Sequence, residues 1–359
     1  MPKARSRKKK HDENDDLDNV PEGDAPGRGI SIPQTPDALA EFVRKEMGVH
    51  VAPSALIDGS DGPLAYLVHS FFEGRFTILP DGSVIDHNET KTPRPPGDCV
   101  VWANRGGGKT FLGAIATALD MIFKPKIEIR ILGGSAEQSR RMHEHLRAIF
   151  EREQFQHLLD GRSTDTRVRL ISGSRRDPLP QRTQRPRRAR PETPLRRGRP
   201  LRRGTLRAAQ LVTRSRSPIP GPWGSEVLGV IEVLSTMHVP MGMMWTLTRE
   251  SGRAQKWAPP PSPGSAGEGR GGGAFDEGAK LTEEAERPPH PPAQSRGHLL
   301  PQSREKGARI LFKWGVVDSL EPCDLANDCD TCSLKEECGG KAKQRTKGGH
   351  MTIRDARAF

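Results

Sequence analysis

A glycine-rich segment between two apolar runs has the residues needed to bind a phosphate group. The nucleotide-binding pattern is a Gly, four residues of any type and then Gly-Lys-Ser/Thr; Gly108, Lys109 and Thr110 match its end, whereas Ala103 stands where the first Gly is usual. Successive glycines let the backbone point N–H groups at phosphate, and a following helix N-terminus adds partial positive charge. Lys109 would then reach the β- and γ-phosphates, and the Thr110 hydroxyl would ligate Mg²⁺. The alternative is a glycine-rich surface turn that happens to carry a Lys.

The flanking residues favour the phosphate-binding loop. Residues 99–102 form an apolar run that predicts a short buried strand, with Cys99 as a small buried residue on it. Residues 111–123 place apolar side chains at helical spacing. The predicted cofactors are therefore ATP and Mg²⁺. The predicted binding residues are Ala103, Asn104, Arg105, Gly106, Gly107, Gly108, Lys109 and Thr110.

The segments that follow continue the alternation of strand and helix. Residues 127–132 alternate apolar and charged side chains and predict a strand, and Ser135 with Gln138 forms a candidate capping box for a helix that ends near Phe150. Residues 168–171 and 227–234 predict further strands, the second of which ends at Ser235 and Thr236. Such an order predicts an α/β domain with a parallel sheet and right-handed crossovers.

Four of the five cysteines form a second cluster of chemically active residues. They are Cys323, Cys329, Cys332 and Cys338, a central C-x2-C pair with a further cysteine at equal distance on each side. Four thiolates can hold one Zn²⁺ ion or an iron–sulfur cluster, and the spacing favours neither. The alternative is a pair of disulfides. A cytosolic chain disfavours it, because thiols stay reduced in the cytosol. A metal would stabilise a module with little apolar core of its own.

Three segments together resemble the ATPase domain of phage-type terminase large subunits, which are DNA-packaging motors. The segments are VVWANRGGGKTFLGA, ILGGSAEQSRRMHEHL and LSTMHVP, and the resemblance covers roughly residues 53–174 and 208–248, with a weaker extension near the C-terminus. It implies a P-loop, RecA-like parallel sheet with helices on both faces. It also implies that Arg105 is the loop Arg of the family and that Ser235 and Thr236 form its coupling motif, which links hydrolysis to movement. Double-stranded DNA and packaging proteins are the implied partners, in an assembly that can be oligomeric.

The family pattern also requires an Asp-Glu pair at the end of a strand between those two blocks, where Asp holds Mg²⁺ and Glu activates water. Residues 175–207 contain no such pair. They hold 13 Arg against Asp177 and Glu192, a net charge of +11 in a chain of net charge +12, and they lack Val, Ile, Phe, Met and aromatic residues. We therefore expect no core strand here. The segment is a disordered arm that grips DNA phosphates, a solvated linker, or the product of translation in the wrong frame.

The wrong-frame hypothesis is compatible with the genetic code. Residues 195–204 can be encoded so that a shift of one base yields Cys-Asp-Glu-Val-Asp-Leu-Phe-Asp-Glu, which supplies the missing Asp-Glu pair. The same shift allows Val-Glu-Ile-Leu at residues 175–178, a strand pattern directly after Ser174. Because the genetic code is degenerate, the residues allow this encoding but do not require it. We favour frame disruption over the disordered arm and the linker. The nucleotide sequence of codons 175–207 distinguishes these hypotheses.

The chain divides into six predicted parts. Residues 1–35 are a disordered tail; residues 36–174 and 208–250 are an incomplete ATPase core, interrupted by the Arg/Pro-rich segment 175–207. Residues 251–307 are a Pro/Gly-rich linker or a second aberrant segment, and residues 308–359 are the cysteine module.

No apolar run reaches membrane-spanning length and no signal peptide is evident, so we expect a cytoplasmic protein that does not contact membranes. The chain ends soon after the cysteines, so we expect no nuclease activity.

Two functions of different classes follow from these features. The first is a terminase-like ATP-binding protein, defective in hydrolysis because the acidic pair is missing. The second is a nucleic-acid-binding or metal-stabilised interaction protein that binds nucleotide without turnover.

Overall fold

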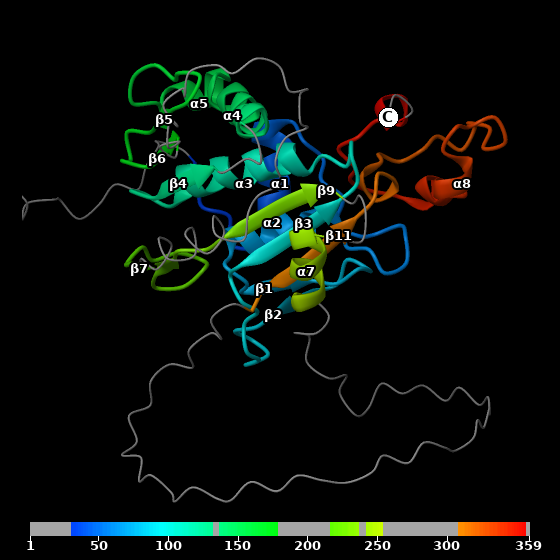
Figure 1. Cartoon of the computed structure of the whole chain (residues 1–359), viewed down its shortest axis with the longest axis horizontal. Coiled ribbons are helices and arrows are strands. Elements are labelled where there is room, and N and C mark those ends of the chain that lie inside the picture. Colours follow the sequence, from blue (N-terminus) through cyan, green and yellow to red (C-terminus); the bar gives the residue numbers. More distant parts are fainter. Residues whose placement is uncertain (1–29, 132–135, 179–215, 237–241, 254–307, 357–359) are drawn as a thin grey trace, which may run out of the picture.

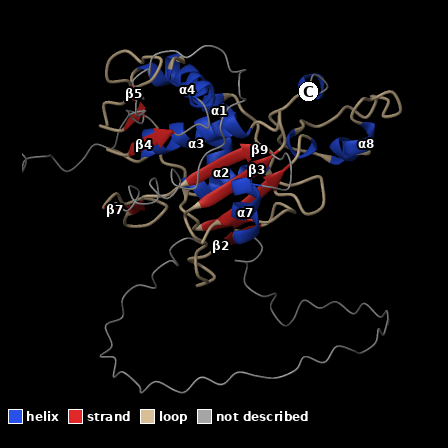
Figure 2. Ribbon diagram, viewed as in Figure 1, coloured by secondary structure: helices blue, strands red, loops and turns tan. Residues whose placement is uncertain are grey.

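A computed structural model describes residues 30–131, 136–178, 216–236, 242–253 and 308–356. The described chain is a mixed α/β structure with several small sheets (Figures 1 and 2). The predicted tail 1–35 lies almost wholly outside these residues.

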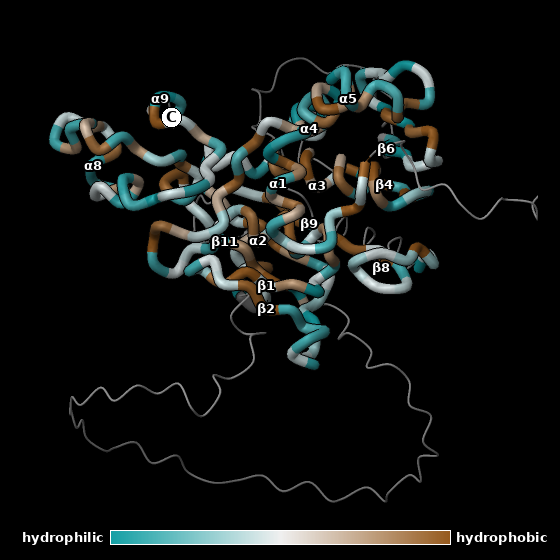
Figure 3. The backbone as a smooth tube through the Cα atoms, turned by 180° about the vertical axis from the view of Figure 1, so that it is seen from behind, coloured by the Kyte–Doolittle hydropathy of each residue, from teal (hydrophilic) through white to brown (hydrophobic). Residues whose placement is uncertain are grey.

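The N-terminal helices supply much of the core. Helix α1 (Pro36–Met47) begins where the Thr35 hydroxyl accepts a hydrogen bond from the backbone N–H of Ala38 at 3.2 Å, and it ends at Gly48, whose φ is 61°. Helix α2 (Pro63–Phe71) is buried along its whole length. A short antiparallel hairpin follows, formed by β1 (Phe76–Ile78) and β2 (Val84–Asp86). In Figure 3, the tube accordingly has the hydrophobic colour along α2 and β1.

A parallel four-stranded sheet forms the centre of the molecule. Its strand order is β10 (Gly252–Arg253), β11 (Ile310–Trp314), β3 (Cys99–Ala103) and β9 (Glu232–Thr236). The strand predicted at residues 99–102 is therefore confirmed, and Cys99 is buried. Strand β9 lies at the edge of this sheet, and among the described strands it pairs only with β3.

The side chains of β3 alternate between two apolar layers. Cys99, Val101 and Ala103 face the main core, which also includes α2 and the helix α3 (Lys109–Phe123). Val100 and Trp102 face the opposite side, where Leu247 of α7 (Gly242–Glu250) packs. Helices therefore cover both faces of the sheet, and Figure 1 shows α7 on the side away from α2.

A second sheet contains β4 (Glu128–Ile131), β6 (Arg175–Pro178) and β5 (Val168–Arg169), in that order. Helix α4 (Ala136–Phe150) follows β4 and is followed by the single turn α5 (Glu153–Gln156). The strand at 127–132 and the helix ending at Phe150 are thus confirmed, while the proposed cap Ser135 lies outside the described residues. The strand predicted at 168–171 is shorter. The chain turns back after Leu170 to form the antiparallel partner β6, and Ile171 is exposed in this turn.

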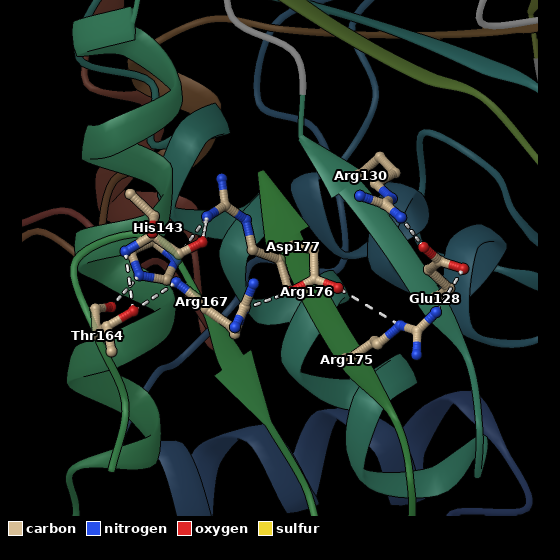
Figure 4. A network of polar contacts seen from close by, with 9 residues as sticks. Glu128, Arg130, His143, Thr164, Arg167, Arg175, Arg176 and Asp177 are labelled. Atoms are coloured by element: carbon tan, nitrogen blue, oxygen red, sulfur yellow. Dashed lines mark hydrogen bonds and ion pairs between the residues drawn. The ribbon is translucent and has the colours of Figure 1, made fainter. Parts of the chain in front are cut away.

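The expectation that the Arg-rich segment forms no core strand is wrong for its first four residues. Strand β6 runs between β4 and β5, and Arg176 is 3% exposed. Figure 4 shows its side chain among its polar neighbours. Its guanidinium donates to Nδ1 of His143 at 3.1 Å and to the Thr166 carbonyl, while Asp177 forms an ion pair with Arg167 at 2.8 Å. Specific polar partners, rather than apolar packing, therefore hold this strand. Residues 179–207 lie outside the described part.

The strand predicted at residues 227–234 is two strands. Strand β8 (Val227–Leu228) pairs antiparallel with β7 (Arg216–Ser217), and β9 begins only at Glu232. The two strands separate because they pair with different partners: β8 with β7 in a small antiparallel sheet, and β9 with β3 in the central sheet. Ser235 and Thr236 do end β9, as expected.

Two predicted boundaries move because the chain returns to the central sheet. Gly252 and Arg253 form β10, inside the segment assigned as linker, and β11 lies within the segment assigned to the cysteine module. The module begins only after β11. It contains η2 (Val317–Ser319), α8 (Lys335–Cys338), η3 (Lys341–Gln344) and α9 (Ile353–Ala356), with a small apolar core that includes Leu320 and Met351.

A buried ionic cluster lies beneath the sheet where α3 ends. The ammonium group of Lys124 is 2.7 Å from a carboxylate oxygen of Asp120 and 3.5 Å from one of Glu73, and its side chain is 2% exposed. Burial raises the pKa of Asp120, and the attraction of Lys124 only partly opposes this. For Lys124, the charges of both carboxylates outweigh burial and raise its pKa. The three side chains form one coupled unit.

Candidate functional site

The glycine-rich segment forms a loop between β3 and α3, at the carboxyl end of a parallel strand. Strand β3 ends at Ala103 and α3 begins at Lys109. Gly106 and Gly108 have φ values of 81° and 70°, a left-handed conformation that glycine adopts without strain. No side chain caps the first N–H groups of α3, so their partial positive charge faces the loop. Left-handed glycines directly before an uncapped helix N-terminus are a backbone arrangement that can accommodate an anion.

The polar side chains of the loop differ in exposure. Arg105 and Asn104 are exposed, whereas Lys109 and Thr110 are half-buried. The Lys109 ammonium donates to the backbone carbonyl of Asn104 at 3.3 Å. Burial lowers the pKa of Lys109, and the nearby positive charge of Arg105 lowers it further. An anionic ligand would relieve that repulsion, because it supplies the opposite charge.

The carbonyl oxygen of Gly107 contacts side chains from the C-terminal part of the chain. The Trp314 indole N–H donates to it at 2.7 Å, and the Ser319 hydroxyl lies 3.5 Å away. The ring of His350 lies against Gly108, so closely that a Cβ on that glycine would be 2.2 Å from Nε2. Burial lowers the pKa of His350 to about 4, so the ring is neutral at pH 7.

The residues of the expected coupling motif lie beside the loop. Ala103 is in register with Thr236 and Trp102 with Ser235, so both hydroxyl residues end β9 at the edge of the sheet from which the loop emerges. Both are half-buried. The structure therefore brings together Ser235, Thr236 and the loop, which are far apart in sequence.

The described carboxylates near the loop already have partners. Asp318 and Asn104 both lie beside Gly315. However, the Asp318 carboxylate already accepts hydrogen bonds from the backbone N–H groups of Leu56, Ile57 and Gly315 at 2.7–2.9 Å. Glu232 lies at the other end of β9, where it accepts a hydrogen bond from Tyr66 at 2.7 Å, and burial raises its pKa. Asp177 belongs to the second sheet, and Glu192 lies outside the described residues.

The four clustered cysteines line one pocket, together with Asn327 and Ala342. All four are free thiols of intermediate exposure. Sγ of Cys338 accepts a hydrogen bond from the Ala342 N–H at 3.5 Å, and Sγ of Cys323 accepts one from Asn327 at 3.5 Å. Across the described chain, however, no three His, Cys, Asp or Glu side chains are close enough to share a metal ion. The donor types fit a metal, but binding would have to draw the sulfurs together.

Comparisons with protein-family models, with curated proteins and with solved structures give no match to this chain. Within the described residues, no helix has both the length and the apolar character needed to span a bilayer. Function must therefore be argued from the site.

Sequence reasoning did not find Trp314, Ser319 and His350 as neighbours of the loop. The only local signal was the apolar run at 308–320, which predicts a buried segment but not its neighbour. The pairing of β11 with β3 places Trp314 opposite Ala103, and so brings Trp314 to the loop.

Proposed function

We propose that this chain is a P-loop nucleotide-binding protein that takes ATP with Mg²⁺. The observation that carries the proposal is the loop itself: left-handed glycines and a Lys at the start of a helix, directly after a parallel strand. Thr236 beside Ala103 adds support, because a hydroxyl at this edge of the sheet would lie near phosphates bound by the loop. Lys109 would bind phosphate and the Thr110 hydroxyl would bind Mg²⁺.

Replacing Lys109 with Ala is expected to weaken ATP binding at least about 100-fold without unfolding the chain, because the ammonium supplies charge to the phosphates while α3 packs through other residues. Calorimetric titration of Mg·ATP measures the effect. Lys313→Ala is the control, since Lys313 is a half-buried Lys on the neighbouring strand β11. Equal ATP affinity in wild type and Lys109→Ala contradicts the proposal.

The more specific proposal is a terminase-like protein, related to DNA-packaging motors and defective in hydrolysis. It rests on the resemblance of the loop, helix α4 and β9 segments, and on their order in the chain. A RecA-like sheet, double-stranded DNA, packaging proteins and an oligomeric state belong to this proposal, as does a cytoplasmic location. The defect follows if no carboxylate is available to fix Mg²⁺ and orient water, which agrees with the engaged state of Asp318.

The alternative function is a nucleic-acid-binding or metal-stabilised interaction protein that binds nucleotide without turnover. The shared pocket of the four cysteines favours it. Zinc or an iron–sulfur cluster would stabilise a module whose own apolar core is small. The two functions are compatible, because the loop and the cysteines occupy different parts of the chain.

Protein purified without oxygen is expected to carry metal at Cys323, Cys329, Cys332 and Cys338. Elemental analysis with an absorption spectrum distinguishes colourless zinc from a coloured iron–sulfur species. Cys332→Ser should lose the metal, whereas Cys99→Ser should keep it, because Cys99 is buried on β3. Finding neither metal in the wild type rules out the metal site.

A further inference from the structure

The carbonyl of Gly107 is held from outside the phosphate loop by side chains more than 200 residues away. Trp314, which is fully buried, donates its indole N–H to this oxygen at 2.7 Å, and the Ser319 hydroxyl approaches it at 3.5 Å. The first contact has the geometry of a strong hydrogen bond, and the second is long. One peptide of the loop is therefore tied to the C-terminal segment.

A trans peptide carries its N–H on the side opposite its C=O. With the Gly107 oxygen directed at Trp314, the N–H of Gly108 must point the other way, away from Trp314. The φ of 70° at Gly108 and the close His350 ring restrict this peptide further, since a Cβ at Gly108 would meet Nε2 at 2.2 Å. The direction of one phosphate-facing N–H thus depends on where the Gly107 oxygen is bound.

The backbone around Trp314 and His350 is well fixed. Trp314 ends β11, which pairs with β3 along five residues. The N–H of His350 donates to the Ser319 carbonyl at 3.0 Å, and Leu320 forms a bridge with Met351. His350 is therefore held beside Ser319, although the cysteines lie between them in sequence.

We propose that Trp314, supported by Ser319 and His350, is a positioning residue for nucleotide binding. It holds the Gly107 carbonyl outside the loop so that the Gly108 N–H faces the phosphates. This inference rests on the proposed function. Without the indole donor, the Gly107 peptide can turn, and its oxygen would then present negative charge to the phosphates.

The test compares two matched substitutions, Trp314→Phe and Trp223→Phe. Trp223 is also buried and also donates its indole N–H to a backbone carbonyl, that of Ile219 at 2.9 Å, but it lies outside the loop. Trp314→Phe is expected to weaken Mg·ATP binding about tenfold or more, because a buried carbonyl loses its partner. Trp223→Phe is expected to bind as the wild type does. Should Trp314→Phe fail to fold, His350→Ala provides the second test and is expected to weaken binding in the same direction.

A second measurement does not need nucleotide. In protein labelled with ¹⁵N-tryptophan, the indole N–H of Trp314 is expected to exchange slowly with solvent, and its resonance is identified by the single Trp→Phe variants. Wild-type affinity in both Trp314→Phe and His350→Ala overturns the positioning role while nucleotide binding stands. If wild type and Lys109→Ala both fail to bind ATP, the proposed function fails, and positioning of nucleotide fails with it. A rapidly exchanging indole would overturn the Gly107 contact itself.

Discussion

A chain carrying Cys-Asp-Glu-Val-Asp-Leu-Phe-Asp-Glu in place of residues 195–203 is expected to hydrolyse ATP at least about 100-fold faster than the present chain. Hydrolysis needs one carboxylate to fix Mg²⁺ and another to orient water, and removing such groups commonly costs this much in rate. The measurement is steady-state phosphate release, with and without double-stranded DNA.

The central sheet has a place for such a strand. The edge of β9 away from β3 has no partner among the described strands, and β9 is only half-buried. A parallel strand added there would end beside Thr236 and the loop, because parallel strands end at the same edge of a sheet. Its carboxylates would then be near the bound phosphates.

The control is the same replacement segment with all of its Asp and Glu residues changed to the corresponding amides. It keeps the apolar pattern but cannot supply either carboxylate, so its hydrolysis should stay at the level of the present chain. If the present chain already hydrolyses ATP as fast as the replaced one, the wrong-frame hypothesis fails, and the Arg-rich segment must be considered a functional arm.

Replacing Lys124 with Ala is expected to lower the free energy of unfolding by about 3–5 kcal/mol. The change leaves the buried carboxylates of Asp120 and Glu73 without their cation, and breaking a buried ionic cluster at one partner is strongly destabilising. Urea denaturation followed by circular dichroism measures the loss. Lys335→Ala is the control, because Lys335 pairs with Asp330 on the surface and its removal should change little.

The loss should depend on pH in a defined direction. The pKa of Asp120 is raised by burial, so its carboxyl in the variant takes up a proton more readily when folded than when unfolded. Destabilisation should therefore be small in acid and grow as pH rises through the folded pKa of that carboxyl. Adding Asp120→Asn and Glu73→Gln should recover much of the stability. A loss that does not change with pH and is not recovered would mean that packing, not unpaired charge, is responsible.

The elements around the loop could be predicted because their signals are local. Three glycines before a Lys, an apolar run on one side and helical spacing on the other depend on residues within one or two turns of each other. Strand β3, helix α3 and helix α4 are found at or near the predicted positions for this reason.

The misjudged elements depend on partners far away in sequence. Strand β6 was missed because composition predicts no apolar core, yet Arg176 is held by His143 and Thr166. The strand predicted at 227–234 is interrupted because its two halves pair with different strands, β7 and β3. Neither contact has a signature within its own segment.

The sequence by itself therefore determined the glycine-rich loop, the helix that follows it and the set of cysteines, since glycine conformation and helical periodicity are properties of neighbouring residues. Only the tertiary structure decided that β11 lies beside β3 and that Thr236 lies beside Ala103. It also decided that Trp314 holds the Gly107 carbonyl and that Lys124 is buried between two carboxylates. The reason is that the order of strands is set by burial of whole faces against one another, which no single segment encodes.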